Sequence, residues 1–428
     1  MRRFTNRWHL TVATLFMSAV VFCTHKAACA ESATTLRFAA VSLADAESMA
    51  VGQSPDVEAA RAGVDAAAAS LAQARDTNGL SALVGYTELP QSSGVPNNTW
   101  SQRIGLYELQ ATLGDVDAQS PLVAQASAAL RGAATDELVA ERTERLKVIG
   151  LYFTAIQARA DLQAKRDAIR RAEAFEDDER AQFSAAKVPY LDLLRAEVAL
   201  SKARADDAAA AAVDANSADG LAREIGWHAA DLRDTVSETV PEPDVIDPDR
   251  AVTRAFAQRP ELRSAAQGVR AAQAGLAAAR RAVIPPITVA GGYARGVDAG
   301  TVIGGPVVSA SIQIPLSGIS TARIAAQQAA LRTALARERG VGRALALEVG
   351  AAAHTAIATI LARDETDAAL EEATSTLTFA SMEYQARRTS GLSVSDARAI
   401  YEQAVIDDIA AQYAALQAHA ILDVELSP

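Results

Sequence analysis

Two stretches of the chain decide its fold, because they are versions of one another: residues 55–64 read PDVEAARAGV and residues 260–269 read PELRSAAQGV. Aligned without a gap at an offset of 205 residues, 21 positions share five identities other than alanine. These identities pair Pro55 with Pro260, Gly63 with Gly268, Val64 with Val269, Leu71 with Leu276 and Arg75 with Arg280. Self-similarity at a fixed spacing is the sign of a repeated structural unit. The chain is therefore a tandem repeat.

The two halves also share one layout. Each is predicted to begin with a helix, pass through a stretch rich in Gly, Pro, Ser, Thr and β-branched residues, and close with a long helical tract. The predicted first helices are residues 42–75 and 249–281, and the interruptions are residues 78–114 and 285–320. A proline-rich connector precedes the second helix. We expect residues 31–240 to form the first repeat and residues 241–428 the second.

Composition favours long helices over a compact core. Alanine occupies 99 of 428 positions, whereas aromatic residues make up only 5%. The tract from Thr321 to Arg388 has 68 residues without a proline, and a helix of that length extends roughly 100 Å. One narrow apolar face of this helix is predicted to pack, because apolar residues recur every three or four positions at Leu345, Val349, Ala352, Ala356 and Ile360. The expected fold class is mainly α with a small β part, in duplicated helix–β-hairpin–long helix halves.

The first 30 residues have the pattern of a secretory signal peptide. Basic residues precede an apolar run from Leu10 to Phe22, and Ala28-Cys29-Ala30 has the small residues of a cleavage site. Cleavage after Ala30 leaves 37 basic and 52 acidic side chains, a net charge of −15, and removes both cysteines. An uncleaved N-terminal anchor and a lipid attached to Cys29 are the alternatives.

The mature chain contains no further run of eighteen apolar residues, so no membrane-spanning helix is expected. An exported chain of this kind is then either free in the periplasm or part of a β-barrel in an outer membrane. Nucleic acid is not an expected partner, because phosphate binding needs a basic face and the sequence offers none.

The interruptions between the helices alternate in hydrophobicity as β-strands do. Residues 308–316 alternate cleanly, residues 287–293 less so, and residues 82–89 and 99–109 hold the equivalent places in the first half with poorer alternation. Each half thus offers one hairpin, and four strands cannot close a barrel, whose minimum is about eight. Either several chains share one barrel, or the hairpins are soluble. The candidate barrel positions are Ile287, Val289, Tyr293, Val308, Ala310, Ile312 and Ile314.

The leader, the duplicated halves and the motifs around the prolines together resemble the TolC-like outer-membrane efflux protein family. The resemblance covers essentially the whole mature chain. Its motifs are SPDV at residues 54–57 and RPEL at 259–262, IQIPL at 312–316, and YLDLL at 190–194 with SVSDA at 393–397.

This resemblance implies a homotrimer, in which three chains form an α-helical barrel across the periplasm and share one twelve-stranded transmembrane β-barrel among the outer-membrane lipids. It also implies a periplasmic adaptor (membrane fusion) protein and an inner-membrane pump as partners. The family's tunnel constricts at a periplasmic tip, where the adaptor docks. Carried over to this chain, the residues of the tip, the gate and the adaptor contact are Asp192, Asp396, Lys187, Pro189, Gly391 and Ser393.

The tip pattern departs from that of the family in two respects. The glycine often found six residues before each tip aspartate is Ala186 in the first half and Ser390 in the second. The second aspartate that some members carry, three residues after the first, is replaced by Arg195 and Ala399. A double ring of cation-binding aspartates is therefore not predicted.

Two interpretations of Asp192 and Asp396 stay open. In a trimer each would form a ring of three carboxylates, which favours cations in a narrow pore. Alternatively, each accepts backbone N–H bonds as the cap of its helix. The mature chain's three histidines, His228, His354 and His419, are too far apart in sequence for a helical metal pair. No phosphate-binding loop or nucleophile motif occurs, so we expect no enzymatic activity, no metal and no cofactor.

The predicted function is that of an outer-membrane channel, the exit duct of a tripartite efflux system. It would conduct small molecules or ions passively from pump and adaptor to the exterior, and would lie in the outer membrane with a periplasmic helical extension. The alternatives are the outer-membrane component of type I protein secretion and a soluble periplasmic coiled-coil scaffold.

Overall fold

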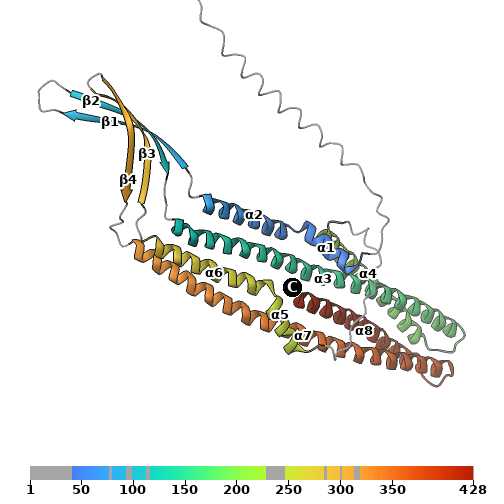
Figure 1. Cartoon of the computed structure of the whole chain (residues 1–428). Helices are drawn as coiled ribbons and strands as arrows, with labels where there is room; N and C mark the ends of the chain where they lie inside the picture. Colours follow the sequence, from blue (N-terminus) through green and yellow to red (C-terminus); the bar gives the residue numbers. More distant parts are fainter. Residues whose placement is uncertain are drawn as a thin grey trace, which may run out of the picture.

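A computed structural model describes residues 41–76, 80–92, 99–111, 116–227, 246–283, 287–298, 301–312 and 319–427. The predicted leader, Ile314 and His228 lie outside these ranges. The molecule is elongated, with a β-sheet at one end and two helical hairpin turns at the other (Figure 1). We call the end with these turns, residues 185–189 and 386–390, the tip. The level of the short helices α1 and α5 is called the waist.

The described elements occur as two copies of one order, which confirms the predicted duplication. The first copy comprises α1 (Leu43–Gln53), α2 (Pro55–Asp76), β1 (Leu80–Ser92), β2 (Thr99–Ala111), α3 (Val116–Ser184) and α4 (Tyr190–Ile225). The second comprises α5 (Pro248–Gln258), α6 (Pro260–Arg281), β3 (Ile287–Asp298), β4 (Thr301–Ile312), α7 (Ile319–Gln385) and α8 (Gly391–Leu426). With 69 and 67 residues, α3 and α7 each extend about 100 Å.

The first helix of each half is broken in two, so the prediction of one continuous helix was wrong in both halves. The break falls at Ser54 and at Arg259, each of which is extended, with ψ of 124° and 128°. Each stands directly before a proline, and the proline ring disfavours helical geometry in the residue that precedes it. The repeated prolines Pro55 and Pro260 thus begin α2 and α6.

The four strands form one antiparallel sheet in the order β1-β2-β3-β4. The two halves meet in it between β2 and β3, where Tyr107 lies opposite Tyr293. The second hairpin differs from the prediction, because β4 begins at Thr301 and ends at Ile312. Gly304, Gly305 and Pro306 belong to this strand, and a stretch of this composition shows no alternation in the sequence. Within the described residues, β1 and β4 each have a strand neighbour on one side only.

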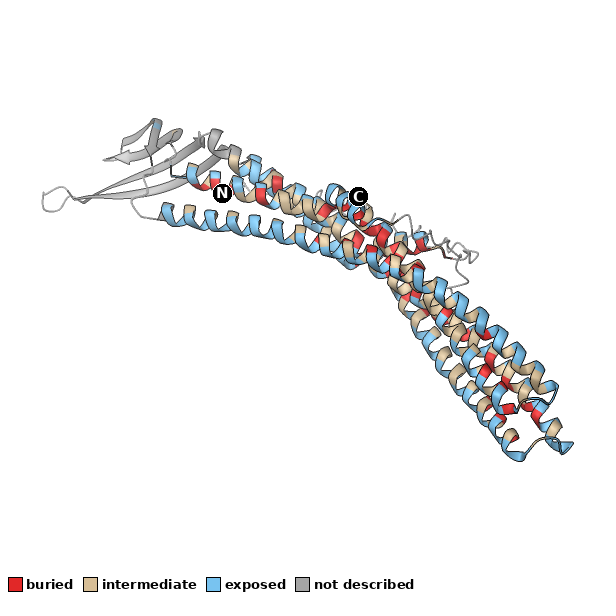
Figure 2. Cartoon of the chain, turned by 90° about the horizontal axis from the view of Figure 1, so that it is seen from below, coloured by how far each residue is buried: buried red, intermediate tan, exposed pale blue. Residues whose placement is uncertain are grey.

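The helices form a layer that changes partners at the waist. Between waist and sheet the neighbours run α2, α3, α6 and α7, and between waist and tip they run α4, α3, α8 and α7. The parts of α2 and α7 nearest the sheet are largely exposed (Figure 2). At the waist, α1 packs on α3 and α4, and α5 packs on α7 and α8.

The predicted apolar face of α7 is confirmed with one change. Leu345, Val349, Ala356 and Ile360 are buried, and Ala353 is buried in the place expected for Ala352. All except Ile360 belong to a cluster with Ala251 and Ala255 of α5 and Leu422 of α8. Small residues dominate this cluster, so the helices approach closely.

Among the described helices, one is long and apolar enough to cross a membrane by length and composition alone, although the sequence predicted no membrane-spanning helix. Residues Thr321–Gln385 of α7 contain an 18-residue window apolar enough to cross a bilayer, although only 28% of that window is buried inside the molecule. Packing within the chain accounts for part of this apolar character, because α7 supplies the buried face described above. The helix also carries Glu348, which hydrogen-bonds Arg259.

Candidate functional site: the tip and the waist

The two turns at the tip have the same backbone structure. Ala186 and Arg387 adopt φ of 54° and 57°, a left-handed conformation in which glycine is usual. In the first turn the Lys187 N–H donates to Gln182 O at 2.9 Å and the Ala186 N–H to Phe183 O at 2.8 Å. The second turn repeats both bonds 201 residues later. By this geometry Ser393, and not Asp396, is the counterpart of Asp192.

The structure places the predicted tip residues on both sides of these turns. Neither aspartate caps its helix: the N-cap residues are Pro189 and Ser390, and neither makes a side-chain cap bond. Asp192 lies in the first turn of α4, where it pairs with Arg195 at 3.2 Å. Of the other predicted tip residues, Gly391 is buried. Four are exposed: Lys187, Pro189, Ser393 and Asp396.

Sequence reasoning missed a buried acid between the two tip turns. Glu179 on α3 is fully buried, and its Oε1 accepts a hydrogen bond from the Tyr384 hydroxyl of α7 at 2.5 Å. Gly391, the first residue of α8, lies against the same carboxyl, since a Cβ at this position would come within 2.9 Å of Glu179 Oε1. Glu179 thus joins α3 to the turn between α7 and α8.

Burial is the largest influence on the pKa of Glu179. It raises the pKa of Glu179, and the charges of Asp192 and Asp178 act in the same direction, while the bond from Tyr384 opposes them. Burial and the bond to Glu179 also raise the pKa of the Tyr384 hydroxyl. The only signal in the sequence was an acid within the run Glu176–Glu179, whose members point in different directions on a helix.

Aromatic contacts reinforce the junction between α3 and α8 next to the tip. The Arg398 guanidinium of α8 stacks on the ring of Phe175 at 4.4 Å, and the Arg171 guanidinium of α3 stacks on Tyr401 at 5.1 Å. Each contact pairs a cation on one helix with an aromatic face on the other. These contacts and Glu179 hold the two helical hairpins together within one chain.

Six of the seven candidate barrel positions lie on β3 and β4. The register sets Ile287 opposite Ile312, Val289 opposite Ala310, Tyr293 opposite Pro306, and Gly291 opposite Val308. The Val308 side chain is exposed. Ile314 lies outside the described residues.

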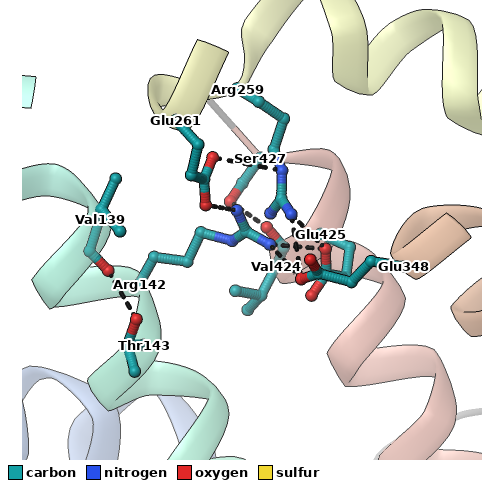
Figure 3. A network of polar contacts seen from close by, with 9 residues as sticks. All are labelled: Val139, Arg142, Thr143, Arg259, Glu261, Glu348, Val424, Glu425 and Ser427. Atoms are coloured by element: carbon teal, nitrogen blue, oxygen red, sulfur yellow. Dashed lines mark hydrogen bonds and ion pairs between the residues drawn. The ribbon is translucent and has the colours of Figure 1, made fainter. Parts of the chain in front are cut away.

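The waist of the second half contains a network of charged residues from five segments (Figure 3). Arg259, at the break between α5 and α6, is 1% exposed. Its Nη2 lies 2.8 Å from Glu425 Oε2 of α8 and donates to Glu348 Oε1 of α7 at 3.1 Å. Arg142 of α3 donates to Glu425 at 2.5 Å and to Glu261 of α6 at 2.6 Å. The network therefore connects α3 of the first half with α6, α7 and α8 of the second.

The first half carries a different cluster at the corresponding break. Ser54 holds the place of Arg259 in the repeat, and its hydroxyl donates to Glu144 Oε2 of α3 at 2.9 Å. Glu224 of α4 holds the place of Glu425 relative to the tip turn, and it pairs with Lys147 of α3. Next to it, Gly226 ends α4 with φ of 74°, and Gln53 Nε2 donates to Ile225 O at 3.2 Å.

Within the described residues, no group of three or more His, Cys, Asp or Glu is placed to hold a metal ion. His354 is exposed, and His419 Nε2 lies 3.4 Å from Asp423 Oδ2 one turn along α8.

The sequence of the second half matches a known family. Residues 251–424, which run from α5 to the end of α8, match the family model described as outer membrane efflux protein. No curated protein sequence matches the chain.

Solved structures share the fold of this chain along most of its length. The outer membrane protein VceC from Vibrio cholerae is 16% identical, with 90% of this chain and 95% of that chain covered and a TM-score of 0.74. The CmeC outer membrane channel of Campylobacter jejuni is 14% identical, with 90% and 85% covered and a TM-score of 0.76. The outer-membrane channel OprN is 16% identical, with 90% and 89% covered and a TM-score of 0.78.

Proposed function

We propose that this chain is the outer-membrane channel of a tripartite efflux system, and that it conducts small molecules or ions passively to the exterior. Three copies form the working channel. A periplasmic adaptor and an inner-membrane pump complete the system, and the pump supplies the energy.

The observation that carries this proposal is the open four-stranded sheet at the end of the long helices. β1 and β4 each leave one edge without a strand neighbour in the described chain. Unpaired edges cannot stand in lipid, where each backbone group needs an internal partner. Three copies joined β4 to β1 supply twelve strands, which is above the minimum of about eight for a closed barrel.

Exposed apolar residues on the outermost helices near the tip support the same assembly. Leu191, Leu194 and Val198 follow one face of α4, and Phe379 and Met382 follow one face of α7, all exposed in the single chain. α4 and α7 are the outer members of the layer between waist and tip. The association of copies side by side would bring α4 of one copy to α7 of the next and remove these side chains from water.

The experiment is to express the full chain and follow it through osmotic shock, membrane separation and extraction. We expect it in the outer-membrane fraction, soluble only in detergent, as a trimer that dissociates on heating and forms conducting pores in planar bilayers. A soluble scaffold would instead leave the cell on osmotic shock and form no pores. A channel for type I protein secretion would also form pores, but an ABC exporter would be encoded beside it.

We also propose that the tip is the gate, with Glu179 and Tyr384 as the bond that keeps it shut. Tyr384→Phe removes the hydroxyl and leaves a buried carboxylate, so we expect the variant to spend more time open in single-channel recordings. Tyr401→Phe, which keeps the ring under Arg171, is the matched control and should behave as the natural protein does. Equal open times in all three proteins would contradict this role.

Asp396 offers a separate test of cation preference. The exposed carboxylate of Asp396 would become a ring of three in the trimer, so Asp396→Asn should lower the preference of the pore for cations without loss of the trimer. Asp407→Asn, which removes an exposed acid farther along α8, is the control. An unchanged preference in Asp396→Asn would exclude the ring.

A further inference from the structure

The waist of the first half contains a buried carboxyl oxygen without a donor. Glu144 on α3 is 4% exposed. Its Oε2 accepts from Ser54, but among the described residues no hydrogen-bond partner lies within range of its buried Oε1. Lys147 Nζ is 3.9 Å from this oxygen, which is beyond hydrogen-bond distance. A buried acceptor left in this state costs about 1–3 kcal/mol, so a further donor is expected.

The group that faces Glu144 is a second carboxyl. Lys147 Nζ, which lies 3.9 Å from Glu144 Oε1, also forms an ion pair with Glu224 Oε1 of α4, so the two carboxyls flank one ammonium group. Asp56 of α2 is the other charged group that acts on Lys147. Three acids therefore surround one lysine. Two carboxylates in contact cannot both be ionised cheaply, and a single proton between them removes the repulsion.

We propose that Glu144 and Glu224 form a proton-binding site, in which one proton held between the two carboxyls at neutral pH joins α3 to α4 at the waist. This proton gives Glu144 Oε1 the donor that it lacks. It takes the place of the arginine side chain with which the second half joins α7 to α8. The Ser54 hydroxyl bonds the other oxygen, so both Glu144 oxygens are then satisfied.

The directions of the two pKa values agree with this arrangement. Burial raises the pKa of Glu144, and Glu224 raises it further, while Ser54 and Lys147 act against them. Burial also acts to raise the pKa of Glu224, but its bonds with Lys147 and Glu144 outweigh burial and lower it. Because the two groups interact, they titrate as a pair, with the shared proton mainly on Glu144.

The test is infrared difference spectroscopy of the detergent-solubilised full-length protein at neutral pH. Glu144→Gln should remove a band of a protonated carboxylic acid that the natural protein shows, and alkaline titration of the natural protein should remove the same band. Glu348→Gln, in the second half, is the matched control and should remove a carboxylate band only. The difference spectrum is needed because burial also raises the pKa of Glu179, Asp161, Asp408 and Glu425.

A second variant tests whether the proton is shared. Glu224→Gln places an amide donor opposite Glu144 Oε1, so Glu144 should ionise and the protonated-acid band should again disappear. Survival of the band in Glu224→Gln would mean that burial alone protonates Glu144, which overturns the sharing. Loss of only a carboxylate band in Glu144→Gln would overturn the site itself. Both substitutions keep the size of the side chain, so both variants are expected to assemble.

Discussion

At the break between its two short helices, the second half of the chain places Arg259 and the first half places Ser54. Both residues precede a repeated proline and both reach a buried glutamate. In the second half the donors are two permanently charged guanidiniums, both on the Glu425 carboxyl, whose pKa burial raises while Arg142 acts to lower it. In the first half the buried glutamate is bonded by the Ser54 hydroxyl and, by our proposal, by a shared proton. One backbone repeat thus supports two chemistries for joining long helices.

The two clusters also differ in the elements that they join. The first-half cluster joins the break before α2 to α3 and α4, which are all elements of its own half. The second-half network includes Arg142 of α3, so it also ties the two halves together. A buried charge that loses its partner is strongly destabilising, whereas a lost neutral hydrogen bond costs less. Substitution of a residue in the second-half network should therefore destabilise the protein more than substitution of a residue in the first-half cluster.

The largest effect is expected for Arg259→Met. This change leaves Glu425 buried beside Arg142 alone and should cost about 3–5 kcal/mol of stability, the usual penalty for breaking a buried ion pair. Thermal melting of the solubilised protein measures it. Arg250→Met, at a side chain that is 90% exposed on α5, is the control and should melt as the natural protein does. Equal melting temperatures of the two variants would contradict the claim that the second-half network is the stronger of the two clusters.

A smaller effect is expected for Ser54→Ala. It removes the hydroxyl that donates to Glu144 Oε2 and should cost about 1–3 kcal/mol, because the acceptor stays buried. Ser70→Ala, at an exposed serine of α2 that bonds only its own helix, serves as the control. If Ser54→Ala destabilises the protein as much as Arg259→Met, the two clusters are equivalent in strength and our comparison fails.

A still smaller effect is expected from pH. The pKa of Glu144 is raised in the folded protein, so its contribution to stability is complete below the ordinary glutamate pKa and is lost as pH rises through the raised value. The melting temperature of the natural protein should therefore fall more on the alkaline side than that of Glu144→Gln. Parallel pH profiles for the two proteins would speak against a proton at this place.

The smallest effect is expected for Arg195→Ala at the tip. Its pair with Asp192 joins two residues three positions apart on α4, and the arginine side chain is 46% exposed. Such surface pairs contribute about 0–1 kcal/mol and are screened by salt. The melting temperature should stay nearly constant, in contrast with Arg259→Met. A loss as large as that of Arg259→Met would show that burial does not govern these ion pairs.

The order of the elements could be predicted from the sequence because the repeat is local in sequence. Five identities around Pro55 and Pro260 were enough to align the halves. The breaks at Ser54 and Arg259 were missed, although the prolines were noticed, because alanine-rich, helix-forming sequence continues on both sides of each proline. The start of β4 was missed because glycine and proline do not reveal which face of a strand they occupy.

The clusters could not be predicted, because their members are far apart in the chain. Arg142 and Glu425 are 283 residues apart, and Glu179 and Tyr384 are 205 residues apart. Only the packing of long helices brings these residues together. Asp192 and Asp396 were paired by their sequence motifs, whereas the backbone bonds of the two turns repeat at an offset of 201 residues. The left-handed positions are held by Ala186 and Arg387, so no glycine in the sequence marked the turns.

The mass of the protein in detergent, measured by native mass spectrometry, tests most directly whether the open sheet is completed by other copies. Our account predicts a particle of three chains that keeps bound lipid or detergent. A monomer that stays in solution without detergent would contradict it, because the edges of β1 and β4 would then be stable without pairing to strands of other copies.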